Sequence, residues 1–276
     1  MLEPALYVVA TPIGNLQDMT PRAVDVLQQV EMVAAEDTRH SARLMAHFGI
    51  NTRLVSVHEH NEHQRIEMIV HQLQSGASVA LVSDAGTPLI SDPGYVVVKG
   101  VREAGFKVVP VPGCAALITA LSAVGLPTDR FVFEGFLPHK ASARRQQLKQ
   151  LADETRTIVF YESPHRILAS LADMQSVFGS ERAVAVAREL TKTYETIHVD
   201  CLSQLIDWMQ ADSNQQKGEF VVVVQGAVAE EQQLDAKALE VLDILLAELP
   251  VSQAAALAAK ITGLKKKVLY QAALDR

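Results

Sequence analysis

In the first 125 residues, short continuous apolar runs alternate with segments whose apolar residues recur every three or four positions. Continuous runs are typical of strands that are buried on both faces of a parallel sheet, and the longer spacing is typical of amphipathic helices. The predicted strands are Leu6–Ala10, Met32–Ala35, Leu54–Val57, Val79–Val82 and Val108–Val111, with a helix after each and the last helix over Ala115–Val124. This alternation predicts βαβ units and a parallel sheet.

A parallel sheet also predicts where a ligand binds. Ligands of such sheets lie beyond the carboxyl ends of the strands. We therefore expect the loops after the first, second, fourth and fifth strands to line a binding site.

The pattern changes after the turn-rich segment Gly125–Asp129. The segments predicted beyond it are the strands Phe131–Phe136, Thr157–Tyr161, Ala183–Ala187, Tyr194–Val199 and Phe220–Val224, a basic helix over Ser142–Ala152 and a helix after Ser163-Pro164. From about residue 230 only helices are expected, and the last two, separated by Thr262-Gly263, have the outline of a helix-turn-helix. The prediction is an α/β fold with two α/β domains, residues 1–125 and 126–229, and a helical, helix-turn-helix-like tail, residues 230–276.

Composition supports a folded protein and restricts its partners. Of the 276 residues, 49% are hydrophobic and 21% charged, so disorder is not expected. The net charge of −7 is unfavourable for nonspecific nucleic-acid binding, so an RNA substrate would require locally gathered basic residues. The two groups that stand out are Lys140, Arg144 and Arg145 on the basic helix, and Lys265, Lys266 and Lys267 in the tail.

The sequence also indicates a cytoplasmic protein. No secretory pattern is found at the N-terminus, and no apolar stretch approaches the length that spans a bilayer. The run His58–His63 is rich in possible ligands, but its spacing matches no zinc motif, and the two cysteines lie far apart. We predict no metal and no contact with a membrane.

The loop Ser83–Gly94 after the fourth strand is the most informative segment. It contains two prolines and two glycines and is longer than most connections of its type, which favours a functional role. The loop after the first strand holds a single glycine, Gly14, where a dinucleotide fingerprint needs three. The loop after the fifth strand enters its helix through small residues only, Gly113 to Ala116, which lets a ligand lie against the helix start.

Two acidic residues, Glu36 and Asp37, end the second strand. Glu36 lies 22 residues beyond Gly14, near the spacing at which a carboxylate binds an adenosine ribose in NAD proteins. Alternatively, an acid at this helix N-terminus pairs with Arg39. The sequence leaves both readings open.

At these residues the chain resembles the ribosomal RNA small-subunit methyltransferase I family, which lies within the tetrapyrrole-methylase superfamily. The resemblance is carried by Pro12–Leu16, Ala35–Arg39, Ser83–Gly94, and Ala187–Lys192 followed by Glu195. It implies two tetrapyrrole-methylase-type α/β domains with S-adenosylmethionine in the cleft between them. It also implies 2′-O-methylation of a cytidine ribose in the decoding centre of 16S rRNA, within the 30S ribosomal subunit, by a homodimer.

The resemblance also implies site residues. The donor contacts it implies are Pro12, Ala85, Gly86, Thr87, Ile90, Ala115, Ala116 and Leu190, with Phe160 or Tyr161 reaching in from the second domain. The chain departs from many relatives at Cys114-Ala115, where we expect an altered turn rather than lost binding. The acidic Gly-Gly-Asp of tetrapyrrole enzymes is absent at Ala85–Thr87, which argues against a porphyrin substrate.

A carboxylate that accepts the proton of the ribose hydroxyl would assist the reaction. Glu36, Asp37 and Glu189 are the candidates by position, although Glu189 could instead pair with Arg188 or Lys192. Three other functions compete with this one: an NAD-type oxidoreductase, a ribosome-binding protein without activity, and a superfamily methyltransferase that acts on a small molecule.

Overall fold

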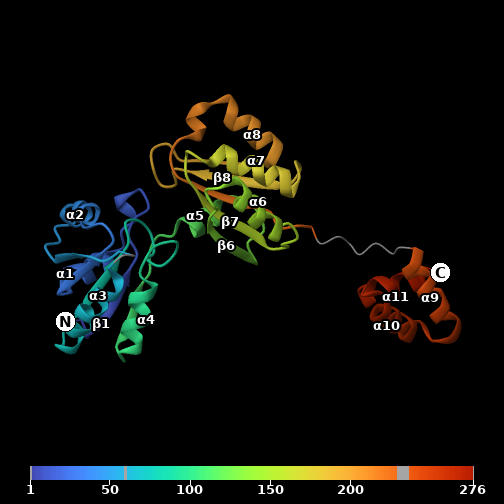
Figure 1. Ribbon diagram of the computed structural model, residues 1–276, viewed down its shortest axis with the longest axis horizontal. Coiled ribbons are helices and arrows are strands. Elements are labelled where there is room, and N and C mark those ends of the chain that lie inside the picture. The colour runs from blue at the N-terminus through green and yellow to red at the C-terminus, as the bar shows by residue number, and fades with distance from the viewer. Residues whose placement is uncertain (1, 59–60, 229–235, 276) are drawn as a thin grey trace. The chain divides into compact units, whose positions relative to one another are not determined.

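The structure, a computed structural model, describes residues 2–58, 61–228 and 236–275 (Figure 1). Contacts within the chain divide it into a larger unit, Met1–Gly226, and a smaller unit, Ala227–Arg276. The larger unit contains two five-stranded sheets with helices, and the smaller unit contains helices. The predicted α/β fold, with two sheets, the helices that pack on them and a helical C-terminal tail, is confirmed. The predicted boundary between residues 229 and 230 lies outside the described residues.

The first sheet is parallel throughout, as the alternation of strand and helix predicts. Its strands are β1 (Ala5–Val9), β2 (Met32–Ala35), β3 (Arg53–Ser56), β4 (Val79–Val82) and β5 (Lys107–Val111), in the order β3-β2-β4-β1-β5. One face packs against α1 (Pro21–Gln29) and α2 (Thr38–His47), and the other against α3 (Glu62–Gln74) and α4 (Tyr95–Glu103). Because β4, β1 and β5 are parallel neighbours, the three loops that follow them emerge side by side.

The second sheet is mixed. Its strands are β6 (Phe131–Phe136), β7 (Thr157–Glu162), β8 (Ala183–Arg188), β9 (Thr196–Cys201) and β10 (Phe220–Val224), in the order β6-β7-β10-β8-β9. Only the β6–β7 pair is parallel, and the other three pairs are antiparallel. Short 3-10 turns lie at Leu16–Asp18 and Ser213–Gln216.

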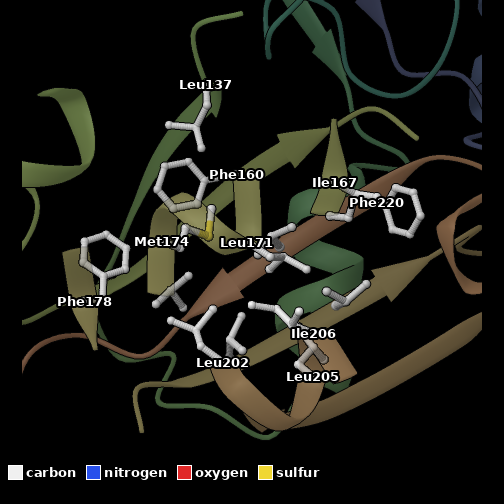
Figure 2. Packing of buried hydrophobic residues seen from close by; sticks show 14 of the residues in the cluster. Leu137, Phe160, Ile167, Leu171, Met174, Phe178, Leu202, Leu205, Ile206 and Phe220 are labelled. Carbon is white, nitrogen blue, oxygen red and sulfur yellow. The ribbon is translucent and has the colours of Figure 1, made fainter. Parts of the chain in front are cut away.

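The two faces of this sheet carry different layers, because side chains alternate along each strand. Phe160 of β7 and Phe220 of β10 face the core formed with α6 (Ala141–Gln150), α7 (Ile167–Phe178) and α8 (Leu202–Ala211) (Figure 2). Tyr161 and Val221, one residue further along, face the opposite side and pack with α5 (Ala116–Ala123). The helix α5 follows β5 in the chain, yet its buried residues pack against the second sheet, whereas the predicted organisation places it in the N-terminal domain.

Some elements differ from those predicted. The helix α8 has no counterpart in the prediction, although Leu202, Leu205, Ile206 and Met209 follow a helical spacing and are all buried. The helix after Ser163-Pro164 begins only at Ile167, because Ser163 and its neighbours are held in a turn by Arg166. The strand β9 begins two residues later than predicted.

The smaller unit consists, over its described residues, of α9 (Ala236–Glu248), α10 (Val251–Thr262) and α11 (Lys266–Leu274). Leu242, Ala255 and Leu269, one from each helix, lie in its core. Gly263 ends α10 with a φ of 76°, a left-handed conformation that glycine adopts without strain. The turn thus brings α11 back against α10, with the small residues Ala255 and Ala258 at the contact.

The Phe160→Ala variant tests the assignment of Phe160 to the core. The side chain is fully buried, so its removal should lower the free energy of unfolding by about 3–5 kcal/mol in urea denaturation. Phe131→Ala, at a position of the same sheet that is 38% exposed, is the matched control and should cost much less. Equal losses in the two variants would contradict this packing.

Candidate functional site

The larger unit holds a cavity of about 340 Å³ between its two sheets. This volume lies at the lower end of the range of small-molecule sites. Residues from the loops after β1, β4 and β5 line one side, and residues from the second sheet line the other. The lining residues are Ile13, Ala85, Gly86, Thr87, Ile90, Ser91, Asp92, Ala115, Ala116, Phe136, Tyr161, Glu162, Ser163, Pro164, Ala187, Leu190, Glu219, Phe220 and Val221.

Backbone hydrogen bonds join the loops after β1 and β4. Thr11 N donates to Gly86 O at 2.9 Å, and Gly86 N donates to Thr11 O at 3.1 Å, which forms an isolated antiparallel bridge. Gly86 has a φ of 82°, and a Cβ at this position would lie 3.3 Å from Ile13 Cγ2. Glycine is therefore needed both for the conformation and for the close approach of the two loops.

The loop after β5 is tied to the same framework. Thr87 Oγ1 donates to Cys114 O at 2.9 Å. Leu117 N, in the first turn of α5, donates to Tyr161 Oη of β7 at 3.2 Å. These two hydrogen bonds fix the start of α5 between the sheets, with the small side chains of Ala115 and Ala116 facing the cavity.

The segment Ser83–Gly94 is held in an unusual conformation. Leu89 and Ser91 have φ values of 74° and 66°, which non-glycine residues seldom adopt. Gly94 N donates to the buried carboxylate of Glu62 at 2.6 Å. Backbone strain of this kind clusters at functional sites, where the surrounding structure compensates for it.

A second strained loop, after β8, forms the opposite rim. Glu189 and Thr191 have φ values of 51° and 66°. Lys192 Nζ lies 2.9 Å from both Glu189 Oε1 and Glu219 Oε2, and Glu219 N donates to Glu189 Oε1. The loop also contacts the first-sheet side of the molecule, since a Cβ on Gly14 would lie 2.5 Å from Lys192 Cγ.

Three carboxylates line the cavity, and their surroundings differ. Glu162 is buried and accepts from Arg166, from Ser163 N and from Ser170 Oγ. Burial raises the pKa of Asp92, Ser83 partly offsets this through a hydrogen bond, and the charge of Asp84 raises the pKa further. Burial likewise raises the pKa of Tyr161.

Eight of the ten residues to which the resemblance assigns donor contacts line this cavity. They are Ala85, Gly86, Thr87, Ile90, Ala115, Ala116, Tyr161 and Leu190. Of the alternatives Phe160 and Tyr161, only Tyr161 faces the cavity, because the pleat of β7 turns Phe160 into the core on the other side. Pro12 is not a lining residue, whereas its neighbour Ile13 is.

The three predicted carboxylate bases do not line the cavity. Asp37 accepts from Arg39 N and pairs with the Arg39 guanidinium at 2.7 Å, which lowers the pKa of Asp37 well below its ordinary value. Of the two interpretations, ribose binding and pairing with Arg39, the structure supports the pairing with Arg39. Glu189 is paired with Lys192, and Glu36, next to Asp37 in the chain, is not a lining residue.

One predicted RNA contact requires correction. Arg144 is only 5% exposed, and its Nε donates to Asp173 Oδ2 at 2.6 Å, so its guanidinium is not available to RNA. Arg145 also contacts Asp173 but has an exposed side chain, and Lys140 is exposed. Lys265, Lys266 and Lys267 are exposed around the start of α11.

The loop after β2 was expected to line the site but does not. Asp37 N, in the loop after β2, donates to Asp84 Oδ1, in the loop after β4. The loop after β2 therefore supports the loop after β4 without lining the cavity. The sequence analysis expected Leu190 and either Phe160 or Tyr161 from the second domain, but it did not identify Phe136, Glu219 and Val221. Val221 lies in an apolar strand that is buried on both faces, and such a strand gives no indication of which residues face a cavity.

The described residues contain no group of three or more side chains suited to a metal ion. Within the run His58–His63, Glu59 and His60 lie outside the described residues. Among all the residues that the structure describes, no helix has the length and apolar character needed to cross a membrane.

Comparison with known proteins places the chain in a family. Residues 5–206 match the family described as Tetrapyrrole (Corrin/Porphyrin) Methylases, and residues 232–276 match the RsmI C-terminal HTH domain. A protein of Pseudomonas aeruginosa named Ribosomal RNA small subunit methyltransferase I is 60% identical, over 98% of this chain and 97% of its own length. The chain belongs to the ribosomal RNA small subunit methyltransferase I family. Another family member, from Escherichia coli O157:H7, is 56% identical over 98% of this chain and 95% of its own length.

Solved structures support the fold of this family member. Cobalt precorrin-4 methyltransferase matches with a TM-score of 0.60 and 18% identity, over 80% of this chain and 95% of its own. Diphthine synthase matches with a TM-score of 0.58 and 15% identity, over 80% of this chain and 89% of its own. At these identities the likeness establishes the tetrapyrrole-methylase fold alone.

The Gly86→Ala variant tests the close approach of the loops. Both Gly86→Ala and the control Gly105→Ala should lose about 1 kcal/mol of unfolding free energy, since both glycines have a φ above 80°. Of these two glycines, Gly86 has neighbouring atoms where the added Cβ would lie, and Gly105 has none within 4 Å. We expect about a tenfold loss of S-adenosylmethionine affinity, about 1.4 kcal/mol in calorimetric titration, for Gly86→Ala alone. The same affinity in both variants would contradict a ligand site here.

Proposed function

We propose that this protein transfers a methyl group from S-adenosylmethionine to the 2′-hydroxyl of a cytidine ribose in the decoding centre of 16S rRNA. The observation that carries the proposal is a cavity lined by eight of the ten residues to which the family resemblance assigns the donor, in a chain 60% identical to a named ribosomal RNA small subunit methyltransferase I. We further propose that it acts on the 30S subunit, in the cytoplasm, as a homodimer.

The residues present suit such a donor. The lining is mainly apolar and small on the side of Ala85, Gly86 and Ala115, which allows a nucleoside to approach the backbone closely. Tyr161 Oη accepts from Leu117 N, so its own proton remains available to a polar group in the cavity. The bound donor would supply an electrophilic methyl group, and the protein's task would be to align it with the acceptor and to exclude water.

The alternatives are less well supported. An NAD-type oxidoreductase would be expected to bring Glu36 or Asp37 to the ligand, and neither lines the cavity. A ribosome-binding protein without activity would not need the strained loops that surround it. A small-molecule methyltransferase would not need the lysines of the smaller unit.

These lysines are placed unfavourably for helix stability. Lys265 is the N-cap residue of α11, and Lys266 and Lys267 occupy its first turn. Positive charge is disfavoured at a helix N-terminus, where the backbone dipole is already positive. A contribution to binding of an anionic partner such as rRNA would explain their position in an otherwise acidic chain.

Methyl transfer from tritium-labelled S-adenosylmethionine tests the function. Unmodified 30S subunits should accept about one methyl group per subunit, and free 16S rRNA should accept much less. Nuclease digestion followed by mass spectrometry should locate the label on a ribose of the decoding centre. Label on a base, or no label in either substrate, would refute the proposal.

Charge reversal tests the contact with RNA. Lys266→Glu combined with Lys267→Glu should weaken 30S binding at least tenfold and reduce the slope of log affinity against log salt by about 2, as expected when two phosphate contacts are lost. The matched control is Lys99→Glu with Arg102→Glu, two exposed basic residues of α4. Unchanged affinity and salt slope in the first variant would exclude these lysines from the RNA contact.

A further inference from the structure

A base for the reaction should be a cavity carboxylate whose oxygens are not already occupied by strong partners. Of the three that line the cavity, Glu162 uses Oε1 for Arg166 and Ser163 N, and Oε2 for Ser170. Glu219 is paired with Lys192. Among the described residues, Asp92 has no basic partner, and the groups that act on it are Ser83 and Asp84.

The fold presents Asp92 in a fixed position. Ser91, directly before it, has a φ of 66°, and Pro93 and Gly94 follow. Gly135, at the bulge of β6, would place a Cβ 3.2 Å from Ser91 Oγ, so this part of the loop lies close to the second sheet. On the far side, Gly94 is anchored by Glu62. The strained backbone thus holds the Asp92 carboxylate at the cavity wall between the two sheets.

We propose that Asp92 is the catalytic base of methyl transfer, a role that rests on the proposed function. An oxygen lone pair of the ribose 2′-hydroxyl forms a bond to the methyl carbon. The bond between this carbon and the sulfonium sulfur breaks, and its electron pair stays on sulfur, which yields neutral S-adenosylhomocysteine. The hydroxyl proton passes to the Asp92 carboxylate and afterwards to water.

The charges around Asp92 suit this role. Asp84 from the same loop is a second acid, and burial together with the charge of Asp92 raises the pKa of Tyr161, another residue of the lining. Glu162 is paired with Arg166, and Glu219 shares Lys192 with Glu189; these two are the other carboxylates of the lining. Burial keeps the pKa of Asp92 above its ordinary value, so the carboxylate binds a proton more readily than an exposed one.

The Asp92→Asn variant tests the proposal in the full-length protein. Single-turnover transfer to 30S subunits, at saturating donor and subunits, should slow by about 10²–10⁴-fold. The wild-type rate should rise with pH through the pKa of Asp92 and then level off, and this rise should be absent in the variant. Donor affinity measured by calorimetry should change less than threefold, and Asp92→Glu should recover part of the rate.

Asp207→Asn is the matched control, because Asp207 is an exposed aspartate of α8 that lies outside the cavity lining. It should retain the wild-type rate. In the free protein, a carboxyl resonance that titrates above the ordinary aspartate value should be present in the wild type and absent from Asp92→Asn.

Two other outcomes would overturn either the role of Asp92 or the proposed function. An unchanged rate in Asp92→Asn, or a loss explained by donor affinity alone, would overturn the role of Asp92 while leaving the proposed function intact. If the wild type itself transfers no methyl group to 30S subunits, the proposed function fails and the role of Asp92 fails with it.

Discussion

The cavity depends on the close approach of two loops at the carboxyl edge of the first sheet. The paired backbone hydrogen bonds between Thr11 and Gly86 hold these loops together, and the left-handed conformation of Gly86 makes the pairing possible. The strand order β4-β1-β5 brings the three loops to one place. This bridge fixes Ile13 and the start of the segment Ser83–Gly94 at the cavity, and the hydrogen bond from Gly94 N to Glu62 anchors the other end of that segment.

The helix α5 extends this framework to the second sheet. Thr87 fixes the loop before α5, and Tyr161 accepts from the first turn of the helix, so its N-terminus is held from both sides. The rest of α5 packs on the face of the second sheet that carries Tyr161 and Val221. The cavity therefore lies between the loops of the first sheet and the face of the second sheet on which α5 packs, and its walls are fixed by packing as well as by hydrogen bonds.

Two groups of charged side chains bear on the proposed function, the carboxylates of the cavity and the lysines of α11. Two carboxylates of the cavity lining have cationic partners: Glu162 is paired with Arg166, and Glu219 is paired with Lys192. Asp92 stands apart from these pairs, which is why we assign chemistry to it. In the smaller unit, three lysines lie at the start of α11, where positive charge is disfavoured by the backbone dipole, and this position is the basis of the proposed contact with RNA.

The sequence by itself determined the alternation of strands and helices, the parallel first sheet and the loop Ser83–Gly94, because apolar periodicity and turn residues are local signals. It left open whether Phe160 or Tyr161 faces the cavity, since both faces of β7 are apolar and only the layers packed on them distinguish the two. The surroundings of the acidic residues were likewise decided by the tertiary structure. Glu36, Asp37 and Asp92 all follow strands, but the pairing of Asp37 with Arg39 and the burial of Asp92 arise from neighbours brought together by the tertiary structure.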